Sequence, residues 1–160
     1  MQGDETHTDE TFKVPKKAAS MLTPLDKAIR AAMDKSESDL KHKLGDFHCP
    51  DHVNFQDSVM VCNHIFTTYR TSEKHSVIFF CEEPSADSLV PAIVDAILLV
   101  PQDGIKHVFL AVHRYLALPA SLLDPFTRYP DFGANLWLSE TQKEITIVLG
   151  SCDIYHVMNL

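Results

Sequence analysis

Residues 76–113 read SVIFFCEEPSADSLVPAIVDAILLVPQDGIKHVFLAVH and contain the densest apolar segments of the chain. β-branched and aromatic side chains dominate 76–81 and 105–113, which predicts two strands. Between them, after a segment rich in turn and cap residues, apolar residues recur at helical spacing and predict a helix over 89–100: Leu89, Ile93, Ala96, Ile97 and Val100. A strand, a helix and a strand in this order predict a βαβ unit with a right-handed crossover.

The segments on either side of this unit predict one more helix and further strands. Before it, a helix is expected to start near Pro24 and to stop at Gly45, with one apolar stripe. Residues 58–70 alternate in polarity and are expected to form a strand that pairs with 76–81. After it, residues 134–139 and 143–149 predict a second hairpin, and 154–157 a short final strand.

This order of elements, α-β-β-α-β-β-β, predicts an α+β fold with two main helices. Its sheet is expected to be mixed, mostly antiparallel, and to contain about five strands. Residues 1–20 are too polar to offset the entropy of ordering them, so a disordered N-terminal arm is expected. Residues 21–160 have the length of one domain.

Charge and composition argue against several classes of function. The formal net charge is −8, and residues 48–160 carry thirteen acidic side chains against six basic ones. Binding to a nucleic acid backbone needs clustered Lys and Arg, so no nucleic acid partner is expected. The longest apolar run, 96–101, is too short to span a bilayer, and no membrane partner is expected. The first residues, MQGDETHTDE, lack the basic and apolar regions of a signal peptide, which favours an intracellular protein, cytoplasmic or nuclear, with reduced thiols.

The densest group of reactive side chains lies in the stretch FHCPDHVNFQDSVMVCNH, residues 47–64. Two pairs in it have the residue types that bind zinc: Cys49 with His52, and Cys62 with His64. The first pair lies in a predicted loop, whereas the second lies on a predicted strand, facing the same side as Met60 and Phe66. Zinc is therefore a conditional hypothesis that requires the loop to fold over the strand, and simple core packing is the competing interpretation.

Catalytic motifs are incomplete. Cys81 lies between a strand and a predicted helix start, but Glu82 and Glu83 follow it and disfavour a thiolate. The chain has no G-x-S-x-G elbow and no phosphate-binding glycine motif. No complete catalytic site is expected. An enzyme is the less favoured class, and no cofactor is expected except zinc under the alternative above.

A proline-containing loop carries the side chains that most often anchor protein interfaces. Aromatic residues and arginine gather in and around residues 115–132, with a tryptophan close behind, and these are the expected interface residues: Tyr115, Phe126, Arg128, Tyr129, Phe132 and Trp137. The sequence therefore favours a small soluble protein–protein interaction module, such as an adaptor, a complex subunit or an assembly factor. Its partner is another protein or a second copy of the chain. The alternative is a zinc-binding or cysteine-dependent enzyme that uses Cys49, His52, Cys62 and His64.

Overall fold

The computed structural model describes residues 24–45, 47–48, 53–82, 89–129, 131, 135–151 and 154–156. Within this part the chain has an α+β fold with one α-helix and eight strands. The elements are α1 (Pro24–Leu44), β1 (Asn54–Gln56), β2 (Ser58–Val61), β3 (His64–Thr67), the 3-10 turn η1 (Glu73–His75), β4 (Val77–Cys81), β5 (Leu89–Gln102), β6 (Ile105–Ala117), the 3-10 turn η2 (Pro125–Arg128), β7 (Trp137–Leu149) and β8 (Tyr155–His156).

Most strands belong to one antiparallel sheet with the order β7-β6-β5-β4-β8, and β1 pairs with a further stretch of β5. Strands β2 and β3 form a separate two-stranded hairpin. Every pairing between these strands is antiparallel. The prediction of an α+β fold with a mainly antiparallel sheet is therefore confirmed.

The predicted helix at 89–100 is wrong, because these residues belong to the 14-residue strand β5. The segment is apolar at most positions, so it fits a helical period and a strand buried on both faces equally well. Its β-branched residues, including Val90, Ile93 and Val94, favour the strand. An irregularity between Val94 and Ala96 then changes which residues face each side of the sheet.

The predicted βαβ crossover is therefore replaced by a long β-hairpin. Asp103 and Gly104 lie at φ 52° and 78°, and they connect the paired residues Gln102 and Ile105. Positive φ at both central positions is the requirement of the two-residue turn that best matches the twist of a hairpin. An Asp-Gly pair between apolar runs is a strong hairpin signal, and it decides the direction of β6.

The first predicted helix is confirmed. Helix α1 runs from Pro24 to Leu44, and Gly45 follows at φ 79°, where its amide donates to the Lys41 carbonyl oxygen at 2.9 Å. This is the left-handed termination that glycine favours. The apolar stripe of α1 packs on the sheet through Ile29, Met33 and Leu40.

Three other local predictions need correction. Residues 58–70 do not form one strand, because Cys62 and Asn63 adopt positive φ and turn the chain back into the β2–β3 hairpin. Strand β4 pairs with β5 and β8 rather than with this hairpin. The predicted hairpin at 134–149 is instead the single strand β7, and the predicted final strand is present as the short β8.

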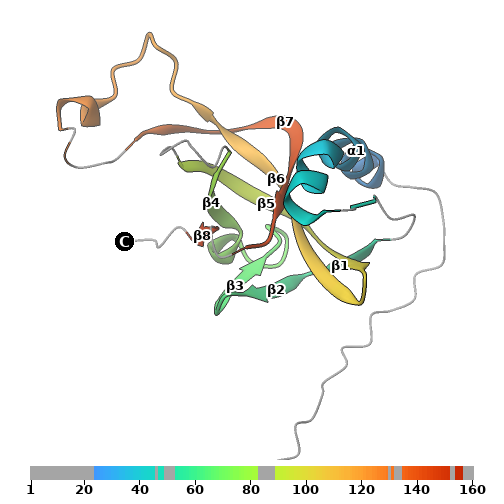
Figure 1. Cartoon of the computed structure of the whole chain (residues 1–160). Coiled ribbons are helices and arrows are strands. Elements are labelled where there is room, and N and C mark those ends of the chain that lie inside the picture. The colour runs from blue at the N-terminus through green and yellow to red at the C-terminus, as the bar shows by residue number, and fades with distance from the viewer. Residues whose placement is uncertain are drawn as a thin grey trace, which may run out of the picture.

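Two apolar clusters cover the two faces of the sheet. One joins α1 to Leu98, Phe109 and Ile147, and the aromatic rings of Phe47 and Phe109 lie 5.5 Å apart within it. The other contains Phe66 of β3 and covers the opposite face. Figure 1 shows α1 beside the sheet, the β2–β3 hairpin at a distance from α1, and β6 and β7 extending together beyond both. That extension positions the candidate site.

The turn between β5 and β6 gives a direct test of the hairpin. A Cβ at residue 104 meets no atom within 4 Å, so Gly104→Ala introduces only backbone strain, which we expect to destabilise the fold by about 1 kcal/mol. Gly104→Asn should cost less, since asparagine tolerates positive φ. Denaturant unfolding followed by circular dichroism measures both.

Gly150→Ala is the matched steric control. A Cβ there would lie 2.8 Å from the Cβ of Val108 and 3.1 Å from its carbonyl oxygen, so this variant should lose more stability than Gly104→Ala. Equal stability of Gly104→Ala and the original protein would contradict the turn.

Candidate interaction site at the end of a β-hairpin arm

Strands β6 and β7 continue past the core as an arm, defined here as residues 115–129 and 135–141. Within the arm, Tyr115 pairs with Thr141, and Ala117 pairs with Trp137. None of these residues is buried, whereas Val112 before the arm and Ile145 after it belong to the core. The arm therefore contains no buried residue of the core, and Figure 1 shows its backbone as the orange segment that projects from the sheet.

One carboxylate organises the end of the arm. The side chain of Asp124 caps η2 by accepting a hydrogen bond from the Phe126 amide at 2.8 Å, and its other oxygen accepts from the Leu136 amide at 3.2 Å. The Thr127 hydroxyl donates to the Asp124 carbonyl oxygen at 2.7 Å. Asp124 thus connects the outgoing and returning halves of the arm, and both of its side-chain oxygens are occupied by backbone amides.

A pocket of about 380 Å³ lies at this end of the arm. Its lining is mainly aliphatic and consists of Ala117, Leu118, Pro119, Ala120, Leu122, Leu123, Asp124, Thr127, Asn135, Leu136 and Trp137. Among the described lining residues Asp124 is the only charged one, and its carboxylate is already engaged. The chemistry of the pocket therefore suits an apolar group rather than an ion.

Large apolar side chains are exposed around the pocket. Leu123 is 88% exposed, Tyr129 66% and Leu122 54%. Exposed apolar side chains gathered at one place mark interaction surfaces more often than scattered ones do. We call the pocket together with these three side chains the arm tip.

The predicted interface residues do not all gather at the arm tip. Phe126 and Arg128 lie in η2, Tyr129 follows it, and Trp137 lines the pocket. Phe132 lies outside the described residues. The predicted interface residues were mainly aromatic and included no leucine. The pair Leu122 and Leu123 in a proline-containing loop was the sequence signal for the exposed leucines.

Tyr115 lies at the base of the arm rather than at its tip. Partial burial of the hydroxyl raises the pKa of Tyr115, and the nearby Glu73 and Tyr69 raise it further. Tyr115 is therefore partly withdrawn from water and lies near the η1 region.

Of the four residues of the zinc hypothesis, the structure describes Cys62 and His64. Cys62 is disulfide-bonded and lies in the exposed β2–β3 turn, so core packing beside Met60 and Phe66 does not explain it. His64 is exposed on β3, opposite Val61. Cys49 and His52, like the cysteine bonded to Cys62, lie outside the described residues.

The zinc site stays a prediction that competes with the disulfide, because a sulfur in a disulfide is not a thiolate ligand. Among the described residues, no three His, Cys, Asp or Glu side chains form a group suited to a metal ion. Cys81, at the end of β4, is half-buried and is not disulfide-bonded. The expectation of reduced thiols is wrong for Cys62.

No protein-family model, curated protein or solved structure matches this chain. Of the helices in the described part, none is both long and apolar enough to cross a membrane.

The raised pKa of Tyr115 predicts a dependence of stability on alkaline pH. The protonated form is favoured in the folded state, so the resulting stabilisation is complete below the ordinary tyrosine value of about 10 and is lost as the pH rises through the folded-state pKa. Tyr115→Phe should therefore show a weaker fall in the free energy of unfolding over that range. An identical fall in the variant would contradict the assignment.

Counting thiols tests the disulfide at Cys62. The chain has four cysteines, Cys81 is outside any disulfide, and one disulfide removes two thiols, so unfolded protein kept from reductant should react at two sites. Cys62→Ser should instead expose three reactive thiols, and the control Cys81→Ser only one. Four reactive thiols in the unmodified protein would contradict the disulfide and would leave the Cys62 thiolate available as a zinc ligand.

Proposed function

We propose that this chain is a protein–protein interaction module, acting as an adaptor, complex subunit or assembly factor, and that the arm tip is its binding surface. The observation that carries the proposal is the aliphatic pocket on a projecting arm, with Leu123 almost fully exposed beside it. A side chain left in water at this place contributes nothing to the core. Its burial against a partner would contribute on the order of 1.5–3 kcal/mol.

The chemistry of the arm tip favours a large apolar anchor from a protein partner. A pocket of about 380 Å³ lies at the lower end of the range for small-molecule sites, and it is wide enough for one or two apolar side chains. Asn135 at its lining adds an amide that can bond to the backbone of such a segment. Apolar anchors seated in pockets carry most of the energy of protein interfaces.

The shape of the arm favours a different protein over a second copy. A stable interface takes roughly 20–30 residues from each side. The whole arm has about that many, and only its far end lines the pocket. Contact between two arm tips would therefore be too small for a stable homodimer, whereas a partner that encloses the tip can also contact the strands of the arm.

Peptide display against the purified protein tests this function without a known partner. We expect selected peptides to share an apolar anchor and to shift the fluorescence of Trp137, the only tryptophan of the chain, because Trp137 lines the pocket. Leu123→Asp should abolish binding of these peptides, since it places a charge at the pocket.

Met60→Asp is the matched control. Met60 is 65% exposed on the β2–β3 hairpin, so the same chemical change is made at an exposed apolar side chain outside the arm. Peptides whose binding is lost with Met60→Asp and retained with Leu123→Asp would place the interaction surface on the hairpin. A selection that yields no binding peptide at all would overturn the proposal.

A further inference from the structure

Core packing holds little of the arm. The buried apolar residues of β6 end at Val112, and those of β7 begin at Ile145. Between these two positions, Trp137 is the one apolar side chain of the described residues that packs against a core cluster. A segment with so little buried apolar area opens more easily than the sheet from which it extends.

The register of the two strands changes where the arm begins. His113 pairs with Ile145 and Tyr115 pairs with Thr141, so four residue steps along β7 match two along β6. A second shift of the same size follows before the pair Ala117 and Trp137. Extra residues in one strand bend it and interrupt its ladder, so residues 142–144 are a natural hinge.

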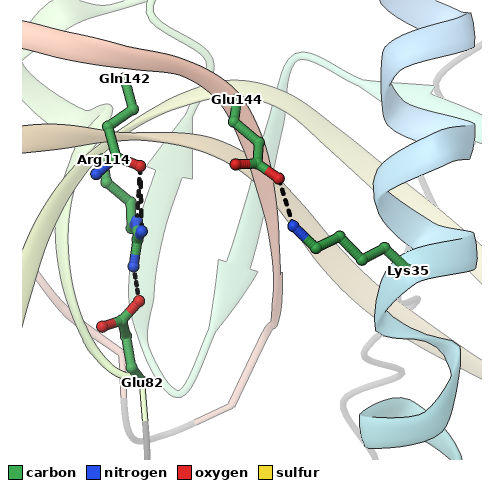
Figure 2. Close-up of polar contacts among 5 residues, drawn as sticks. All are labelled: Lys35, Glu82, Arg114, Gln142 and Glu144. Atoms are coloured by element: carbon green, nitrogen blue, oxygen red, sulfur yellow. Dashed lines mark hydrogen bonds and ion pairs between the residues drawn. The ribbon is translucent and has the colours of Figure 1, made fainter.

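Polar side chains hold this hinge from two sides. The Nδ1 atom of His113 lies 2.9 Å from the Gln142 carbonyl oxygen. Arg114 donates to the side-chain oxygen of Gln142 from Nε at 3.2 Å and from Nη2 at 3.1 Å. Two successive residues of β6 therefore bind the backbone and the side chain of the same residue in the bulge, and Figure 2 shows the Arg114 contact.

Two carboxylates connect these side chains to the rest of the sheet. Arg114 also pairs with Glu82 at the end of β4, and Nε2 of His113 lies 3.5 Å from Oδ2 of Asp95 in β5. The side chains of His113 and Asp95 are each only 22% exposed. We call Glu82, Asp95, His113, Arg114 and Gln142 the brace, since together they tie the hinge to the neighbouring strands.

A third contact at the hinge lies in water and serves as a comparison. Lys35 of α1 and Glu144 form an ion pair at 2.5 Å, with their side chains 75% and 64% exposed (Figure 2). Exposed pairs of this kind contribute little, whereas removing one partner of a half-buried network leaves the other unsatisfied. The brace, rather than the Lys35 pair, therefore dominates the free energy of holding the arm.

We propose that the brace is a latch that regulates the arm tip. Closed, it keeps Trp137 against the core and holds the pocket in the observed form. Open, it lets the arm turn about residues 142–144 while the sheet stays folded. Trp137 belongs to both the pocket and the core contact. An apolar anchor that binds the closed and open positions of the arm with different affinities therefore shifts the equilibrium between them. By the same coupling, a change in that equilibrium changes the affinity for the anchor by an equal factor.

The regulatory part of this inference rests on the proposed function, but the motion of the arm does not. The test uses the full chain without any partner. We expect Arg114→Met to move Trp137 emission to longer wavelength and to add a fast component to its anisotropy decay. Amide hydrogen exchange in residues 115–129 and 135–141 should accelerate about tenfold, with that of β5 unchanged.

Gln142→Ala is the second variant, because it removes one acceptor of the brace and leaves the charges and the backbone carbonyl in place. It should give the same pattern with a smaller change. The control Lys35→Met, which removes the exposed ion pair of Glu144 in the same bulge, should change none of these readings.

Two results would overturn the latch. The first is unchanged exchange and anisotropy in both brace variants. The second is exchange of the arm and of β5 at one common rate in the original protein, which would mean that the arm opens only by global unfolding. If the arm is mobile but the peptide selection fails, only the proposed function is contradicted. If the arm is fixed but still binds peptides, only the latch is contradicted.

Discussion

The antiparallel pairing of β5 with β6 is the constraint on which the other elements depend. The turn at Asp103 and Gly104 starts this pairing, and the register then runs as far as Ala92 and Arg114. One edge of β5 accepts β4 and β1, and the outer edge of β6 accepts β7. Both faces of the pair are apolar, so α1 covers one and the β2–β3 hairpin the other. The arm exists because β6 and β7 extend beyond these coverings.

Local signals in the sequence identified the elements better than their pairing. Helix α1 was predictable because its apolar stripe, Pro24 and Gly45 all agree. Strand β5 was not, because a run that is apolar at nearly every position carries no period. The Asp-Gly pair after it carried the missing information, since a two-residue turn at positive φ joins antiparallel strands and leaves no room for a crossover.

The candidate site was predictable in part and for a similar reason. Composition pointed to the proline-containing loop that contains Phe126 and Tyr129, and the structure places that loop at the arm tip. The pocket depends on how Leu136 and Trp137 return beside Ala117, which follows from the register of β6 and β7. The brace depends on bulges in that register. Neither is encoded in any single stretch of residues.

The Cys62 region shows a different failure, in which an alternating sequence pattern predicted one strand where the backbone turns back. Cys62 and His64 seemed to share a strand face, but the left-handed conformations of Cys62 and Asn63 put a turn between them. Cysteine rarely adopts positive φ, which costs on the order of 1 kcal/mol. Because the alternation of polarity continues through this turn, the sequence pattern did not predict it.

The arm tip is apolar and the brace is polar, and this difference affects the free energy of opening the arm. An arm held to the sheet by buried leucines would expose them whenever it moved, at the full cost of hydrating apolar area. An arm held by Gln142, His113 and Arg114 exposes groups that water satisfies, so opening costs the net strength of a few hydrogen bonds and ion pairs and the hydration of one apolar side chain, Trp137. The core can then stay intact while the arm changes position. The exposed leucines lie in the connection between β6 and β7, and the hinge lies in β7, so a movement at the hinge would carry the proposed binding surface with it.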